Sequence, residues 1–114
     1  MKTAFALALL ALAVSAPSAA AKSKSCTAPA YPVAGGSFTS LKVTKATCAK
    51  ARKVALAFYK CRTKTGPTGR CVKKIEGGYA CQEVRTSTPA DISARVTCKK
   101  KKKKVTFAYQ QTLA

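Results

Sequence analysis

The sequence has no histidine and no tryptophan, and only three of its 114 residues are acidic. Histidine is the commonest general base in enzymes, and the other usual acid–base catalysts are carboxylates placed near one another. Lys or Arg residues lie close in sequence to both glutamates. The three carboxylates are scattered along the chain: Glu76, Glu83 and Asp91. A catalytic acid–base pair is therefore not expected, and the sequence predicts a protein that is not an enzyme.

Long hydrophobic runs are also scarce, with one exception near the N-terminus. After Lys2, residues 4–14 ("AFALALLALAV") are uninterruptedly apolar, and the small residues 15–21 ("SAPSAAA") follow them. This pattern is typical of a secretory signal peptide, and the run is too short to span a membrane. We therefore expect residues 1–21 to be a signal peptide cleaved after Ala21, and the protein to be secreted with no transmembrane segment.

Cysteine, in contrast, is abundant for so short a chain. An even number of cysteines in a small secreted protein is typical of a disulfide framework, and a domain of this size has a thin core that needs such cross-links. No two cysteines have C-x-x-C spacing, and histidine is absent, so neither a metal nor another cofactor is expected. The predicted disulfide cysteines are Cys26, Cys48, Cys61, Cys71, Cys81 and Cys98.

Positive charge dominates the part of the chain that follows the predicted signal peptide. Lys and Arg total 22 against three acids, so without Lys2 the remaining 93 residues carry a formal net charge of +18. A field of this sign attracts polyanions, and its size exceeds what solubility requires.

Local patterns predict the first elements of the fold. Residues 22–37 are rich in Pro, Gly and small residues, which predicts an irregular lead-in, and residues 38–43 alternate as in a strand. Residues 48–61 place apolar side chains at helical spacing, and Thr47 is positioned to cap the helix. The apolar stripe is mostly alanine, which favours packing on a sheet over the alternative, a basic helix lying on a membrane.

The spacing of two cysteines predicts a hairpin in the C-terminal half. Cys81 and Cys98 are centred between Pro89 and Ala90, in the middle of the turn sequence "TPAD". A hairpin folded at this point places the two cysteines directly opposite one another, within reach of a disulfide.

The pairing of the other four cysteines is predicted from their spacing. Cys61 and Cys71 flank the turn-rich sequence "TKTGPTGR", which favours a local bridge and leaves Cys26 to pair with Cys48. This is one of 15 possible pairings, and its chief rival links Cys48 to a strand of the sheet.

Six consecutive lysines in "CKKKKKKV" separate two alternating segments, "RVTC" and "VTFAY". Two strands joined at Lys100–Lys103 would place these lysines at a hairpin tip, where water relieves their repulsion. We therefore expect an α+β fold in which one amphipathic helix packs on a small antiparallel β-sheet, disulfide-stapled, as a single domain over residues 38–110 with a C-terminal tail at 111–114.

The segments "VTKATCAKARKVA", "GGYACQ" and "RVTCKKKKKKVTFAY" together resemble a family of small secreted cysteine-containing proteins of soil actinobacteria. The resemblance covers residues 38–109 and implies an α+β domain and an exported location, but it implies no activity. Cys61 and Cys71 look like an added local pair, and lysine stands where the last turn usually has glycine. The matching positions are Cys48, Ala51, Val54, Tyr79, Cys81, Val96, Cys98, Val105 and Phe107.

The dense positive charge predicts a monomer that binds anionic polymers of the cell envelope or matrix. Lysine is a flexible point charge that suits tolerant attraction. Specific nucleic-acid recognition is not expected, because the aromatic residues fall at core spacing and do not alternate with the basic ones. The predicted binding residues are Lys99, Lys100, Lys101, Lys102, Lys103, Lys104, Lys50, Arg52 and Lys53.

Two alternatives to polymer binding remain open. The lysines could serve only to keep a structural secreted protein soluble and to prevent strand edges from pairing. The stapled scaffold could instead inhibit a secreted hydrolase, because the loop over residues 63–70 would be pre-organised by a Cys61–Cys71 bridge.

Overall fold

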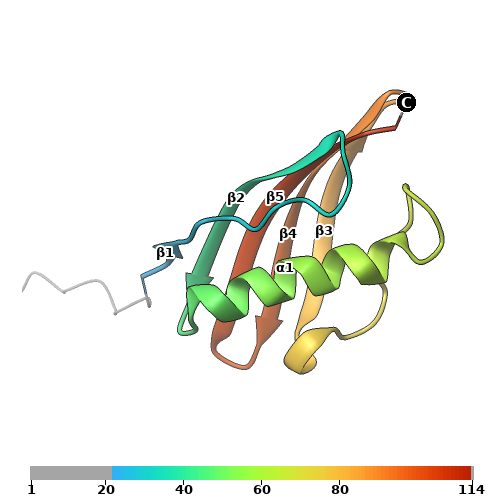
Figure 1. Ribbon diagram of the computed structural model, residues 1–114. Helices are drawn as coiled ribbons and strands as arrows, with labels where there is room; N and C mark the ends of the chain where they lie inside the picture. The colour runs from blue at the N-terminus through green and yellow to red at the C-terminus, as the bar shows by residue number, and fades with distance from the viewer. Residues whose placement is uncertain (1–21, 114) are drawn as a thin grey trace, which may run out of the picture.

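The computed structural model describes residues 22–113, in which one helix packs on a five-stranded antiparallel sheet (Figure 1). The predicted signal peptide lies outside the described residues. The strand order is β1-β2-β5-β4-β3. The elements are β1 (Lys24–Ser25), β2 (Gly36–Thr44), α1 (Cys48–Thr63), the short 3-10 helix η1 (Glu76–Gly78), β3 (Ala80–Ser87), β4 (Asp91–Lys100) and β5 (Lys103–Thr112).

The helix α1 begins where the sequence predicts and ends two residues later than expected. The Thr47 side chain accepts a hydrogen bond from the backbone N–H of Lys50 at 3.1 Å, which satisfies one of the free donors of the first turn. Ala51, Val54 and Phe58 are almost completely buried against the sheet. The prediction that this stripe faces a sheet is therefore confirmed.

The hydrophobic core lies between α1 and one face of the sheet. Alternation along β2, β4 and β5 sends every second side chain into this layer, as expected for a sheet that is covered on one side. The lead-in and the loop that follows α1 lie on the same side of the sheet as the helix (Figure 1). The main strand residues of the core are Leu41, Val43, Ile92, Ala94, Val96, Cys98, Val105, Phe107 and Tyr109.

The β3–β4 hairpin has the register that its cysteines predict. Cys81 pairs directly with Cys98, and the turn is closed by the backbone N–H of Thr88, which donates to the carbonyl oxygen of Asp91 at 2.9 Å. Because the cysteines face each other across two antiparallel strands, one disulfide joins them directly.

All three disulfides have the predicted pairing: Cys26–Cys48, Cys61–Cys71 and Cys81–Cys98. The first joins the lead-in to the start of α1, the second joins the last turn of α1 to the loop beyond it, and the third cross-links the sheet. The α+β class and the disulfide-stapled architecture are thereby confirmed.

Two segment boundaries differ from the sequence-based expectation. The lead-in over residues 22–37 contains β1, which pairs with β2, and the strand expected at residues 38–43 spans Gly36–Thr44. The strand β5 continues to Thr112, beyond the expected end of the domain, because the backbone N–H of Thr112 donates to the carbonyl oxygen of Gly35 at 2.8 Å.

No helix within residues 22–113 is long and apolar enough to cross a membrane. In the same part of the chain, no three potential metal ligands of the His, Cys, Asp or Glu type come together.

Candidate polyanion-binding surface

The six consecutive lysines lie at the β4–β5 hairpin, and most of them belong to the strands. Lys99 pairs directly with Lys104, and Lys100 pairs with Lys103, so that only Lys101 and Lys102 form the turn. The expected four-residue tip is therefore two residues long. Since Cys98 and Val105 point into the core, alternation directs the Lys99–Lys104 pair to the opposite, uncovered face of the sheet.

The turn itself holds a lysine in an unfavourable backbone conformation. Lys101 has φ of 54°, in the left-handed region that glycine adopts without a steric cost. We expect Lys101→Gly to stabilise the domain by about 1 kcal/mol, because it relieves this strain and removes one of six adjacent charges. Urea unfolding followed by circular dichroism measures the change.

Lys102→Gly is the matched control for this prediction, because it removes the same charge from the same turn at a residue whose φ is not positive. Glycine there adds freedom to the unfolded chain without relieving strain, so a stability equal to or below that of the parent is expected. Equal stabilisation by both substitutions would show that charge repulsion, and not backbone strain, is the cost at the tip.

The fold brings two further lysines to the hairpin tip. Lys45, in the turn between β2 and α1, lines a hollow of about 430 Å³ together with Lys100–Lys103. Lys50, in the first turn of α1, lies over Gly77, while the Lys100 side chain lies over the neighbouring Gly78. The first turn of α1 thus joins the tip in one cationic cluster, which we call the basic end: Lys45, Lys50 and Lys99–Lys104.

One carboxylate lies at the basic end. The Glu76 carboxylate in η1 forms an ion pair with the Lys50 ammonium group at 3.7 Å, and both side chains are substantially exposed. An exposed pair of this kind contributes little to stability. Among residues 22–113, no lysine of the β4–β5 hairpin forms an ion pair with a carboxylate.

The other two predicted helix cations do not join this cluster. Arg52 is half-buried and Lys53 is exposed on α1, and neither lines the hollow at the tip. Of the nine residues that the sequence predicts for polymer binding, the structure therefore gathers seven at one end of the molecule.

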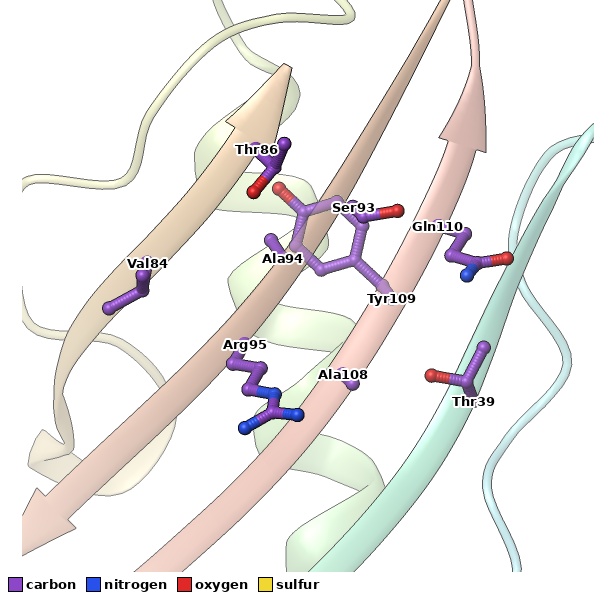
Figure 2. Close-up of a pocket in the computed structure, with 9 residues that line it drawn as sticks. All are labelled: Thr39, Val84, Thr86, Ser93, Ala94, Arg95, Ala108, Tyr109 and Gln110. Carbon is purple, nitrogen blue, oxygen red and sulfur yellow. The ribbon is translucent and has the colours of Figure 1, made fainter. Parts of the chain in front are cut away.

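The face of the sheet opposite α1 extends the basic surface. Figure 2 shows this uncovered face with Arg95 of β4 near its middle, between Val84 and Ala108 on the neighbouring strands. Two adjoining hollows of about 460 and 530 Å³ lie on it and share Arg95. Lys42 of β2 lines the second, and the Lys99–Lys104 pair follows towards the tip.

Hydroxyl groups surround these cations on the uncovered face. The side chains that line the two hollows include several short hydroxyl-bearing residues: Thr39, Ser40, Thr86, Ser93, Thr97 and Thr106. Asp91 begins β4 at the end remote from the tip, where its carboxylate accepts a hydrogen bond from the Thr88 hydroxyl at 3.1 Å. From Arg95 to the tip, the described strands therefore present cations and hydroxyls without a carboxylate on this face.

Aromatic side chains are packed away from the basic surface, as the sequence predicts. Tyr79, Phe107 and Tyr109 are each at most 2% exposed, and Tyr59 packs edge-on against Tyr31. Tyr109 and Phe107 are among the residues that line the two hollows, but both are buried and present no open ring face for base stacking.

A buried polar network on the helix side is a feature that the sequence reasoning missed. Arg62 at the end of α1 is 1% exposed and donates to the Tyr31 hydroxyl at 2.8 Å and to the Gln111 side-chain oxygen at 2.5 Å. Its guanidinium carbon also lies 4.5 Å from the centre of the Tyr109 ring. The helical spacing held a clue, because Arg62 follows Phe58 by four residues on the buried stripe.

The same network contains the one buried carboxylate of the described chain. Glu83 accepts hydrogen bonds from Arg85 and from the Tyr109 hydroxyl, the latter at 2.8 Å. Burial raises the pKa of Tyr109 well above its usual range, and the hydrogen bond to Glu83 acts in the same direction. The Tyr109 phenol is thus held in its neutral form, as a hydrogen-bond donor to Glu83.

Comparisons with known proteins bring no further identification. No protein-family model, no curated protein and no solved structure matches this chain.

Proposed function

We propose that this protein is secreted and binds anionic polymers of the cell envelope or extracellular matrix, without catalysis, through the basic end and the uncovered sheet face. The signal-peptide pattern and three disulfides support an extracellular location, because disulfides persist in oxidising compartments. The resemblance to secreted actinobacterial proteins predicts the same location.

The observation that carries this proposal is that the lysines are held together at a cost to the fold. Like charges directly opposite one another on paired strands are destabilising, and the tip has two such pairs, Lys99–Lys104 and Lys100–Lys103. Lys101 adds the strain of a positive φ. Solubility alone would be served by the same charges spread apart, whereas a polyanion favours their concentration.

The composition of the surface indicates which ligands it suits. Lysines and hydroxyls are common partners of phosphate oxygens, and flexible lysines tolerate many spacings between negative groups. Phosphodiester polymers of the cell wall and acidic polysaccharides both fit this description. Binding should therefore be broad in specificity and strongly dependent on salt.

Charge removal at the tip provides the test. We expect the double variant Lys101→Gly, Lys102→Ser to bind heparin and purified cell wall more weakly than the parent. The slope of log affinity against log salt concentration should fall by roughly one for each lysine that contacts the polymer. Fluorescence titration at four salt concentrations measures this slope.

The control removes two lysines from the opposite end of α1, with the variant Lys60→Ser, Lys64→Ser, whose side chains are exposed. Its net charge equals that of the tip variant, but its binding should remain close to that of the parent. Equal weakening by both variants would contradict a localised site and would show that binding follows net charge alone. Absence of binding by the parent would favour the alternative that the charge serves solubility.

A further inference from the structure

Val72 is the most exposed large hydrophobic side chain among residues 22–113, at 94% of its full surface. Single exposed apolar residues are common on proteins and carry no meaning by themselves. Val72 differs because the fold holds it in a short segment, Cys71–Lys74, that is fixed at both ends.

The two anchors of this segment are covalent and hydrophobic. Cys71 is bonded to Cys61 in the last turns of α1. Ile75 is partly buried against the core, and its backbone N–H donates to the carbonyl oxygen of Tyr79 at 2.9 Å. Only Val72, Lys73 and Lys74 lie between the anchors, and all three are exposed.

The preceding loop serves as a support for the segment. Its carbonyl oxygens accept hydrogen bonds from buried guanidinium groups: Arg62 donates to Pro67 at 2.7 Å, and Arg85 donates to Thr68 and Gly69 at 2.7 and 2.8 Å. The loop expected to face a hydrolase, residues 63–70, therefore turns part of its main chain inward. The exposed segment lies directly after it.

The backbone polar groups of the segment are not paired with other backbone groups of the described chain. Within the described residues 22–113, no backbone N–H or C=O of residues 70–74 hydrogen-bonds to another backbone group. Peptides that occupy a protease cleft lie extended and pair their main chain with the enzyme, in the manner of an added strand. The segment bends at Lys73 and would have to straighten there to lie extended in a cleft. Because it is fixed at both ends, it has already lost part of the conformational entropy that such binding costs.

We propose that Cys71–Lys74 is a substrate-like inhibitory loop for a secreted serine endopeptidase of the elastase type, with Val72 in the S1 pocket. A small S1 pocket selects a small aliphatic side chain, which matches valine. The flanking Lys73 and Lys74 suit an enzyme with an acidic rim, since complementary charge accelerates association. Arg70 before them is held in an ion pair with Glu83 at 3.5 Å. This inference is independent of polymer binding.

The anchors also explain why such a loop would inhibit and not be consumed. When the enzyme's serine oxygen attacks the Val72 carbonyl, the Val72–Lys73 bond breaks and the Lys73 amine receives a proton. Ile75 in the core and the Cys61–Cys71 bridge keep the two new ends close together. The same amine can then attack the acyl ester, release the serine and restore the bond in competition with water.

Inhibition of purified elastase-type and trypsin-type endopeptidases, measured with chromogenic peptides at high salt, tests the inference. We expect the parent to inhibit the elastase-type enzyme, Val72→Asp to inhibit it at least about 100-fold more weakly, and Val72→Lys to inhibit the trypsin-type enzyme. Val84→Asp is the matched control, because Val84 is 76% exposed on the uncovered sheet face and should leave inhibition unchanged.

A second variant separates inhibition from mere binding. With Cys61→Ser and Cys71→Ser together, the loop loses one anchor and should become a substrate cut at the Val72–Lys73 bond, which mass spectrometry detects. Failure of the parent to inhibit the elastase-type enzyme, or equal inhibition by Val72→Asp, would overturn the inference. Inhibition of only the trypsin-type enzyme by the parent would overturn the assignment of Val72.

Discussion

Reduction of the three disulfides is expected to unfold this domain at 25 °C. The bridges close separate, non-overlapping loops with sequence separations of 22, 10 and 17 residues. By loop entropy each stabilises the fold by about 3 kcal/mol, and because the loops do not overlap their effects add to about 9 kcal/mol. The whole free energy of unfolding of a small domain is typically about 5–15 kcal/mol. Repulsion among the lysines lowers what remains.

Far-UV circular dichroism with and without a phosphine reductant, at constant ionic strength, measures this effect. The oxidised protein should melt cooperatively, while the reduced protein should lack the transition. The variant Cys61→Ser, Cys71→Ser removes only the bridge that closes the smallest loop and should lose about 3 kcal/mol, so that it remains folded. A melting temperature that does not change on reduction would show that the core suffices alone.

The fold was predictable because local signals and covalent geometry agree. Thr47 and the apolar stripe define the start and the buried face of α1, and the midpoint of Cys81 and Cys98 falls in the observed turn. Strand alternation on either side of the lysine run specifies the β4–β5 hairpin. Each of these signals involves residues near in sequence or paired across one turn, and such relations can be read without a structure.

The arrangement of the candidate site depends on contacts that no local pattern specifies. Lys45 and Lys50 belong to a turn and a helix that reach the tip only because β2 pairs with β5, although β3 and β4 intervene in the sequence. The support of the loop before Val72 likewise depends on the carbonyl oxygens to which Arg62 and Arg85 donate. The sequence identifies the lysines and the loop. The pairing of β2 with β5 determines which lysines lie together at the tip.

The buried network explains how so basic a chain can place guanidinium groups in its interior. The side chains of Arg62 and Arg85 are both nearly inaccessible, and Glu83, the one buried carboxylate of the described residues, forms an ion pair with Arg85. The remaining positive charge is met by the Tyr109 ring and by backbone carbonyl oxygens of the supporting loop. This balance stabilises the loop that carries Cys71 and, beyond it, Val72.

Glu83→Gln is therefore expected to destabilise the domain by about 3–5 kcal/mol, although it replaces only one side-chain oxygen and removes a single negative charge from the protein. The Glu83 side chain is 7% exposed, so its loss of charge leaves the buried Arg85 guanidinium without its anion and breaks the ion pair with Arg70 at 3.5 Å. Glu76→Gln is the matched control, since the Glu76 side chain is 48% exposed and its pair with Lys50 should contribute less than about 1 kcal/mol. Urea unfolding of both variants makes the comparison. Equal losses of unfolding free energy would mean that net charge, and not the buried pair, limits stability. A large loss for Glu83→Gln alone would show that the buried Glu83–Arg85 pair beneath the loop at residues 63–70 stabilises the fold.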